Sequence, residues 1–365
     1  MSFSDYRSYS RRKLLQLAGL AAGSTAVSVA CNAVTTPSEE ISAQSSPGSS
    51  PDSAAAPETA VPAGSGVSRV VLVRSEDRVA GTRKAIDLLQ PEGITGQTVF
   101  LKPNYNTADP APASTDTALL EALVQELQNA GAGQITVGDR SGMAETRQAM
   151  QTKGVFELAD RYGLNAIVLD ELSQADWQYF PPAGTHWSKG FAFARPALQA
   201  EAVVNTCCLK THRFGGHFTL SLKNTVGLVA KYVPGDSYNY MGELHSSPHQ
   251  RLMIAEANKV YSPALVLLDG VEAFVNGGPE AGDVAKPGVI LAGTDRVAVD
   301  VVAIGILRSL GTSSTVAQGS VWDLEQIKRA VELGLGAGSP DQIEIVTADS
   351  ASQTTADQIR PLIVA

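Results

Sequence analysis

From residue 67 onward, short apolar runs alternate with stretches of helical periodicity, and this alternation restricts the fold more than any other feature. Strands are expected at residues 68–74, 98–103, 134–137, 166–169, 202–209, 264–268, 289–292 and 343–346, and helices at 78–89, 115–130, 154–162, 247–260, 297–310 and 321–333. Short buried strands that alternate with helices are typical of a mostly parallel sheet with helices on both faces. The pattern therefore predicts an α/β domain over residues 67–365.

The first 30 residues have the pattern of a twin-arginine signal peptide. Ser10-Arg-Arg-Lys-Leu-Leu15 precedes a stretch rich in Leu, Ala and Gly that ends at Ala30. Paired arginines before a mildly apolar run are typical of the twin-arginine route, which carries folded proteins. An ordinary secretory signal with a basic start is the alternative interpretation. We expect export by the twin-arginine machinery to the periplasm or the outer face of the membrane.

The sequence after the signal peptide predicts a tether. Cys31 follows the small-x-small sequence Ser28-Val-Ala30, so it is a candidate for lipidation, although a lipobox prefers Leu, Val or Ile where Ser28 stands. Residues 31–66 are rich in Ser, Ala, Pro, Gly and Thr, a composition that predicts disorder. The membrane is thus expected as a partner only through a lipid anchor on Cys31.

Charge and cysteine content exclude several classes of protein. The formal net charge is -9, which disfavours binding to nucleic acid. Three cysteines are too few for a disulfide framework or a four-cysteine iron–sulfur cluster. Cys207 and Cys208 lie inside an apolar run, so we expect them to be reduced strand residues.

One segment is cationic within this acidic chain. All five histidines lie between residues 186 and 249, and the window 207–251 holds five Lys or Arg but only two acids. Cationic groups in a concave site attract anions. The segment therefore predicts that the ligand is a small anionic molecule with a carboxylate or phosphate group.

Polar residues follow several of the predicted strands, and ligands of parallel sheets lie beyond the carboxyl ends of the strands. The polar groups at these ends are Lys102-Asn104, Asp139-Arg140, Lys210-His212, Asp269 and Asp295, and the candidates taken from them are Lys102, Asn104, Lys210, His212, Asp269 and Asp295. His212 is expected to act as general acid or base, with Lys210 as a second catalytic residue. Asp269, Asp295 or Asp300 would orient the histidine or the substrate. Asp300 has an alternative interpretation as a helix-face acid that pairs with Arg296.

Further candidates surround a pair of glycines. Arg213-Phe-Gly-Gly-His217 places two glycines between charged groups, where backbone amides can approach a ligand closely. A helix beginning near Thr219 would direct its first amides at an anion, with Lys223 and Asn224 in its first turns. We therefore add Arg213, His217, Lys223 and Asn224 to the binding residues. The segment 277–282 is expected to be a wide turn or a lid.

The sequence leaves the type of activity open. No Walker, Gly-x-Gly-x-x-Gly, Gly-x-Ser-x-Gly or His-Glu-x-x-His motif stands in a suitable context, and Pro248 separates His245 from His249. No metal ligands are predicted, and the cofactor is unknown. An enzyme acting on a small anion is the first hypothesis. A binding protein without turnover and a metal or redox-cofactor protein are the alternatives.

Seven short motifs, in this order, resemble the family called "domain of unknown function 362". They are Leu101–Asn104, Ala132–Asp139, Leu209–His212, Ser221–Asn224 with Gly227, Asp269-Gly270, Gly278–Gly282 and Gly293–Asp300. The resemblance runs from about residue 67 to about residue 310, and it implies an α/β domain with little settled chemistry. Some relatives carry a ferredoxin-like module with cysteine-rich repeats that this sequence lacks. Family-like sequences often have a proline and a lysine where Cys207 and Cys208 stand here.

Overall fold

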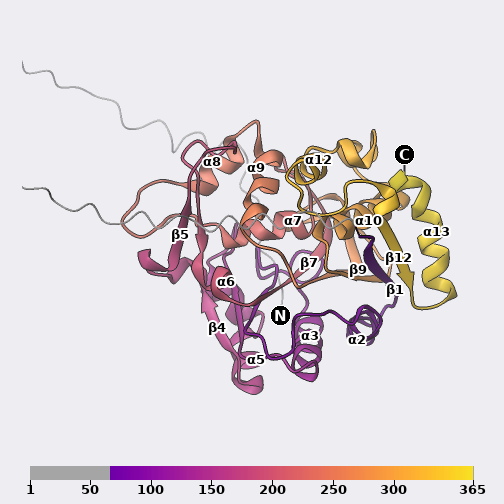
Figure 1. Cartoon of the computed structure of the whole chain (residues 1–365), viewed down its shortest axis with the longest axis horizontal. Coiled ribbons are helices and arrows are strands. Elements are labelled where there is room, and N and C mark those ends of the chain that lie inside the picture. The colour runs from indigo at the N-terminus through magenta and orange to yellow at the C-terminus, as the bar shows by residue number, and fades with distance from the viewer. Residues whose placement is uncertain (1–65, 365) are drawn as a thin grey trace, which may run out of the picture. The chain divides into compact units, whose positions relative to one another are not determined.

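The computed structural model describes residues 66–364, which form a ten-stranded sheet, a small two-stranded sheet and helices around them (Figure 1). The predicted signal peptide, Cys31 and nearly all of the predicted tether lie outside the described residues. The two-stranded sheet pairs β5 (Trp177–Phe180) with β6 (Phe191–Ala194). The large sheet contains β1 (Ser68–Arg74), β2 (Val99–Lys102), β3 (Ile135–Asp139), β4 (Asn165–Val168), β7 (Ala202–His212), β8 (His217–Thr219), β9 (Leu265–Gly277), β10 (Gly282–Ala285), β11 (Val289–Gly293) and β12 (Ile343–Thr347).

The large sheet is mostly parallel, as predicted. Its order is β12-β1-β11-β9-β7-β2-β3-β4, with β8 paired to β7 and β10 paired to β9 at the side of this path. Parallel pairing joins β12 to β1, and it joins β9, β7, β2, β3 and β4 in succession. β11 is antiparallel to both of its neighbours, β1 and β9. The carboxyl end of β11 therefore lies at the opposite edge of the sheet from the carboxyl ends of the other strands on this path.

Helices cover both faces of this sheet, and each face has its own apolar cluster. α2 (Arg78–Leu89), α3 (Thr117–Asn129) and α5 (Val155–Tyr162) lie on one side of the strands in Figure 1. α9 (Gln250–Glu256), α10 (Arg296–Ser309) and α12 (Glu325–Glu332) lie on the other. The remaining helices are α4 (Thr146–Thr152), α6 (Arg195–Gln199), α7 (Ser221–Asn224), α8 (Tyr240–Ser246), α11 (Ser314–Ala317) and α13 (Ser350–Val364). The short 3-10 helices are η1 (Leu169–Glu171), η2 (Gln174–Asp176), η3 (Thr225–Leu228), η4 (Ala257–Val260), η5 (Val321–Asp323) and η6 (Pro340–Gln342).

Local sequence explains where the longer helices start and which face they bury. Asp116 caps α3 by accepting hydrogen bonds from the backbone N–H groups of Ala118 and Leu119. The apolar residues that recur at helical spacing in α3 are all buried. α10 differs, because every residue from Arg296 to Leu307 is buried. A helix that is covered on all sides is a central element of the core.

Several predicted elements are longer or more divided than the sequence indicated. β7 continues to His212 and β9 to Gly277, because each forms a hairpin with a strand that periodicity did not reveal, β8 and β10. Lys210, His212 and Asp269 are therefore strand residues and do not follow a strand end. The predicted helix at 247–260 is α9 continued by η4, and His245 belongs to the separate helix α8.

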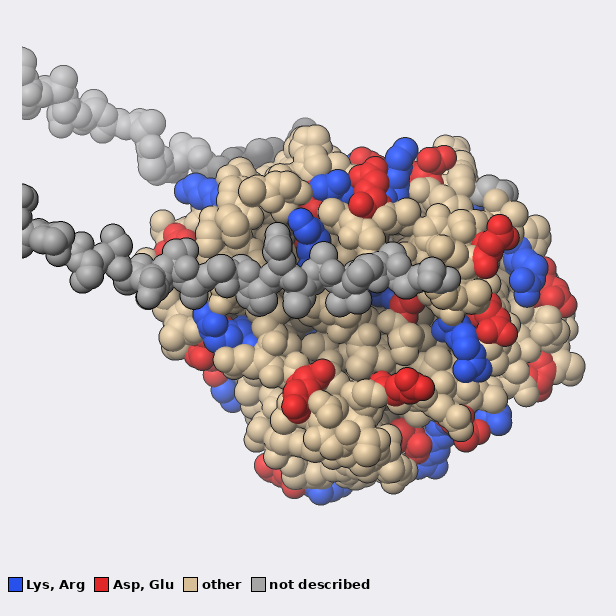
Figure 2. Space-filling model, viewed as in Figure 1, with Lys and Arg blue, Asp and Glu red and all other residues tan. Residues whose placement is uncertain are grey.

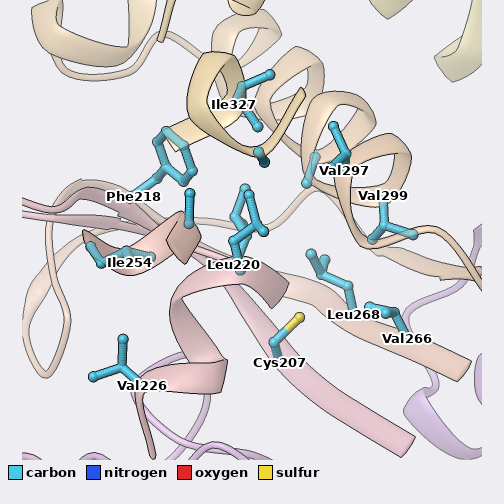
Figure 3. Packing of buried hydrophobic residues seen from close by; sticks show 14 of the residues in the cluster. Cys207, Phe218, Leu220, Val226, Ile254, Val266, Leu268, Val297, Val299 and Ile327 are labelled. Carbon is cyan, nitrogen blue, oxygen red and sulfur yellow. The ribbon is translucent and has the colours of Figure 1, made fainter. Parts of the chain in front are cut away.

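Cys207 and Cys208 are buried and unbridged, as expected. Figure 3 shows Cys207 on its strand among apolar side chains that include Leu268 and Leu220. Burial raises the pKa of Cys208 to about 11 and that of Cys207 well above its ordinary value. Both thiols are thus protonated at neutral pH, which suits a packing role.

The surface of the described residues is mixed in charge. Figure 2 shows Lys and Arg side chains interspersed with Asp and Glu side chains on the visible face. Within residues 66–364, no helix combines the length and the apolar character that crossing a bilayer would require.

Candidate functional site

A cleft opens near the carboxyl ends of β2, β3 and β7, and the segment from α7 to η3 lies beside it. The volume of the space inside it is about 70 Å³. The strands and the loops after them contribute Lys102, Asn104, Asp139, Arg140 and His212, and the helices contribute Lys223, Asn224 and His245. The cleft therefore gathers Lys102, His212 and Lys223, half of the cationic candidates that the sequence singled out.

Lys102 and Asp139 form a buried ion pair at the floor of the cleft. The Lys102 Nζ lies 2.7 Å from Asp139 Oδ1, and the two side chains are 1% and 2% exposed. Lys102 also donates to Asn224 Oδ1 at 3.1 Å. The Asp139 carboxylate accepts backbone N–H bonds from Tyr105 and Arg140, each 2.7 Å long. Burial lowers the pKa of Lys102, but the neighbouring carboxylate opposes that shift.

Arg140 is a buried guanidinium whose hydrogen bonds to oxygen all go to backbone carbonyls. It donates to the carbonyl oxygens of Val226 at 2.6 Å, Val229 at 2.7 Å and Ser141 at 3.2 Å. Within the part of the chain that the structure describes, it forms no ion pair. The contacts to Val226 and Val229 hold the η3 segment against β3, and the positive charge lies next to the cleft without a carboxylate of a described residue in direct contact.

Lys223 is the second buried cation of the cleft without a carboxylate. Its side chain is almost wholly buried, and it makes no hydrogen bond or ion pair with any residue from 66 to 364. Burial, together with the positive charges of Arg140 and Lys210, lowers the pKa of Lys223 to about 7. An anion in the cleft would reverse this effect, because a negative charge favours the ammonium form.

Two histidines line the same cleft. His245 Nδ1 lies 2.8 Å from the carbonyl oxygen of Met241, and a carbonyl can only accept, so the neutral ring carries its proton on Nδ1 and a lone pair on Nε2. His212 Nδ1 is buried without a partner among the described residues. Burial and neighbouring cations lower the pKa of His245 and hold that of His212 well below 6.5. Both rings are therefore neutral at pH 7 and can exchange a proton with a ligand.

Lys210 lies behind the cleft and does not line it. Its buried Nζ donates to Asn104 Oδ1 at 2.7 Å and to the carbonyl of Ala113 at 2.5 Å. Asn104 in turn donates to Asn224 Oδ1 at 3.1 Å, and Asn224 donates to Asn205 Oδ1 at 2.6 Å. This geometry lets Lys210 position Asn104.

Arg213 and His217 lie near the cleft but outside its lining. Arg213 pairs with Glu280 and donates to the carbonyl of Gly278 at 2.8 Å, which holds the loop whose Pro279 lines the cleft. His217 faces His212 across the β7–β8 hairpin. The two residues are thus placed to support the loop and the hairpin around the site.

Asp269 and Asp295 lie away from the cleft. Asp269 forms a 2.7 Å ion pair with Arg78 at the start of α2. Asp295 caps α10 and also accepts hydrogen bonds from Ser68 Oγ and the Ala337 N–H. It follows β11, the antiparallel strand, so the expectation that it would meet the other strand ends fails for a topological reason.

The start of α7 corrects a second expectation. The buried carboxylate of Asp300 accepts the backbone N–H groups of Ser221 at 2.8 Å and Leu222 at 3.0 Å. These first amides were expected to face a ligand, but they face Asp300. Burial raises the pKa of Asp300 to about 7.

Several residues of the cleft were not predicted as site residues: Asn106, Asp139, Arg140, Thr219 and His245. The sequence marked Asp139 and Arg140 as polar groups at the end of the predicted strand 134–137, but they were not counted among the binding residues. The only sequence signal at His245 was its four-residue spacing from His249, which does not indicate a cleft. The contact of His245 with the cleft depends on how α8 packs. Among residues 66–364, no three or more His, Cys, Asp or Glu side chains are grouped as metal ligands would be.

Known proteins resemble this chain over most of the described region. A thylakoid-associated protein of Synechocystis is 27% identical over 259 residues, which cover 66% of this chain and 75% of that protein. The lactate racemase apoprotein from Thermoanaerobacterium thermosaccharolyticum is 16% identical, with a TM-score of 0.36 over 57% of this chain. This match covers 51% of that structure, about half of its length. A sequence model of one family matches residues 99–305, more than half of the chain, and so the chain belongs to the family described as Domain of unknown function (DUF362).

Proposed function

We propose that this protein is exported and that its cleft binds a small anionic molecule, on which it acts as an enzyme by general acid–base catalysis. The observation that carries the proposal is the charge balance of the cleft. Lys102, Arg140 and Lys223 line it with a single carboxylate, that of Asp139. Buried charges that lack a counter-charge are costly, and an anionic ligand would offset this cost.

The two neutral histidines supply the acid–base chemistry in this proposal. The Nε2 lone pair of His245 and the unpartnered Nδ1 of His212 belong to rings that line the cleft. A group that transfers protons works best when it holds the right protonation state near the working pH.

Calorimetric titration of the purified protein with inorganic phosphate, acetate and pyruvate tests anion binding. Lys223→Met keeps the length of the side chain and removes its charge, so we expect the affinity for the best of these anions to fall at least about tenfold. Lys259→Met is the matched control, because Lys259 is exposed and lies outside the cleft lining. Equal affinities in the wild type and in Lys223→Met would contradict the proposed site.

Catalysis is tested separately from binding. Native mass spectrometry of the exported protein can identify a retained ligand, whose turnover can then be measured in His212→Gln and His245→Gln. We expect His245→Gln to bind that ligand with nearly unchanged affinity and to lose turnover, and His212→Gln to lose turnover by a larger factor than it loses affinity. A wild-type protein that binds the ligand without converting it would instead be a binding protein without turnover.

A further inference from the structure

Beyond its charges, the cleft contains a set of side-chain donors with no partner among the described residues. His212 Nδ1, Thr219 Oγ1 and Asn106 Nδ2 are buried and make no hydrogen bond, and all three residues line the cleft. Buried polar atoms are nearly always hydrogen-bonded, so three such atoms in residues around one space call for a bound group. The Lys223 ammonium, which also makes no hydrogen bond with a described residue, lines the same space.

The chemistry of these atoms restricts that group to an acceptor. The Asn106 amide nitrogen and the Lys223 ammonium can only donate, while the Thr219 hydroxyl and the His212 Nδ1 can donate as required. A carboxylate presents two oxygen atoms, whereas a phosphoryl group presents three strong acceptor oxygens on one centre. Four donors from separate elements suit the tetrahedral group better than the planar one.

The charges of the cleft also favour a phosphoryl group over a carboxylate. When Lys223 is protonated, three cations and one carboxylate leave two positive charges at the cleft. A monocarboxylate would neutralise only one of them. A phosphate monoester carries about -1.5 to -2 at neutral pH and would neutralise nearly both.

We propose that the cleft binds the phosphoryl group of a small phosphate monoester through Lys223, Thr219, Asn106 and His212. This inference rests on the proposed function and narrows its ligand from an anion of any kind to a tetrahedral dianion. The charge of Lys223 attracts any anion, whereas the hydroxyl and amide donors bind only where their hydrogen bonds can align. These donors therefore favour a tetrahedral anion over a planar one.

Calorimetric titration with four anions at pH 7 separates shape from charge. Inorganic phosphate and sulfate are tetrahedral, malonate is a dianion built from planar carboxylates, and acetate is a planar monoanion. We expect phosphate and sulfate to bind at least about tenfold more tightly than malonate and acetate. Equal or tighter binding of malonate or acetate would overturn this inference and leave the proposed anion site intact.

Thr219→Val tests the role of the uncharged hydrogen-bond donors, because it removes the hydroxyl group and keeps the volume of the side chain. We expect it to weaken phosphate and sulfate binding about three- to tenfold and to change acetate binding less than twofold. Thr206→Val is the matched control, since Thr206 Oγ1 is also buried and unpartnered among the described residues but lies outside the cleft lining. Equal effects of the two variants would overturn the assignment of Thr219, provided that both keep the wild-type melting temperature. The proposed function as well would be overturned if the wild type bound none of the anions, or if Lys223→Met bound them as tightly as the wild type.

Discussion

Lys102 and Lys223 are two buried lysines of the same cleft whose surroundings give them different roles. Asp139 lies 2.7 Å from the ammonium of Lys102, while Lys223 has no such partner within residues 66–364. Two glycines make room for these groups. A Cβ at position 227 would approach the Lys102 Nζ to 2.7 Å and Asp139 Oδ1 to 2.6 Å, and one at position 216 would lie 3.0 Å from Lys223 Cε. The cleft thus has one lysine that anchors the structure and one that is available to a ligand.

We predict that sulfate binding weakens as the pH rises above about 7. Lys223 has a pKa of about 7 in the free protein, so above this pH it must take up a proton before it can pair with the anion. The affinity should therefore fall by up to about tenfold per pH unit above pH 7 and change little just below it. Calorimetry with sulfate isolates the protein's titration, since the charge of sulfate is constant between about pH 6 and pH 9.

The other charged groups of the cleft do not produce this dependence. Arg140 stays protonated, and Lys102 and Asp139 compensate each other. His212 and His245 have lowered pKa values and are already neutral at pH 7. An affinity for sulfate that stays constant from about pH 7 to pH 9 would contradict the role assigned to Lys223.

At the scale of elements, α7 depends on a carboxylate from a distant helix. It has four residues and no side-chain cap of its own, and its first two N–H groups are bound by Asp300 of α10. The same element carries Lys223 and Asn224 toward the cleft. The contact between α10 and α7 therefore links the core of the protein to the position of its candidate ligand-binding residues.

Substitutions of Asp300 test this link. Asp300→Val leaves two buried N–H groups without an acceptor, so the free energy of unfolding should fall by about 2–5 kcal/mol. Asp300→Asn keeps an acceptor oxygen and should cost less than half as much. Denaturant unfolding followed by circular dichroism measures both values, and equal losses in the two variants would contradict the capping role.

The stability of the wild type should also depend on the protonation of Asp300. Its pKa is raised from 3.8 to about 7, so between these values the unfolded chain releases a proton that the folded chain retains. This group therefore makes the free energy of unfolding decrease as the pH rises from about 4 to 7. The decrease should be smaller in Asp300→Asn, and an unchanged slope would assign it to other groups.

At the scale of the whole molecule, an acidic body surrounds a cationic cleft. The formal net charge is -9, and the visible surface mixes both signs of charge (Figure 2). Anions are therefore attracted only where buried cations focus the field locally. Such a site must be assembled by folding, which is consistent with the expected export of a folded protein through the twin-arginine route.

Replacing Arg11 and Arg12 by lysines distinguishes the two interpretations of the amino terminus. The twin-arginine machinery recognises the arginine pair, so the double variant should remain in the cytoplasm. A general secretory signal needs only positive charge, and export would then continue unchanged. Cell fractionation with immunoblotting measures the distribution, and normal export of the double variant would contradict the twin-arginine proposal.

The sequence by itself determined the class of the fold and the location of its cationic segment. Apolar periodicity is a local property, so it revealed most of the strands of the large sheet and its mainly parallel character. Hairpin strands such as β8 and β10 were missed, because they are short and are held by pairing and not by periodicity. Lys102, Asn104, His212, Lys223 and Asn224 stood out as polar or charged residues beside apolar runs, and all five line one cleft.

Only the tertiary structure decided which of these groups are compensated. The direction of β11 depends on pairing with β1 and β9, and this placed Asp295 at the other edge of the sheet. The neighbours of Lys102 include Asn224, which is 122 positions away along the chain. Burial and charge compensation arise from contacts between segments distant in sequence, so no local pattern could have shown that Asp139 neutralises Lys102 while Lys223 is left without a counter-charge among the described residues.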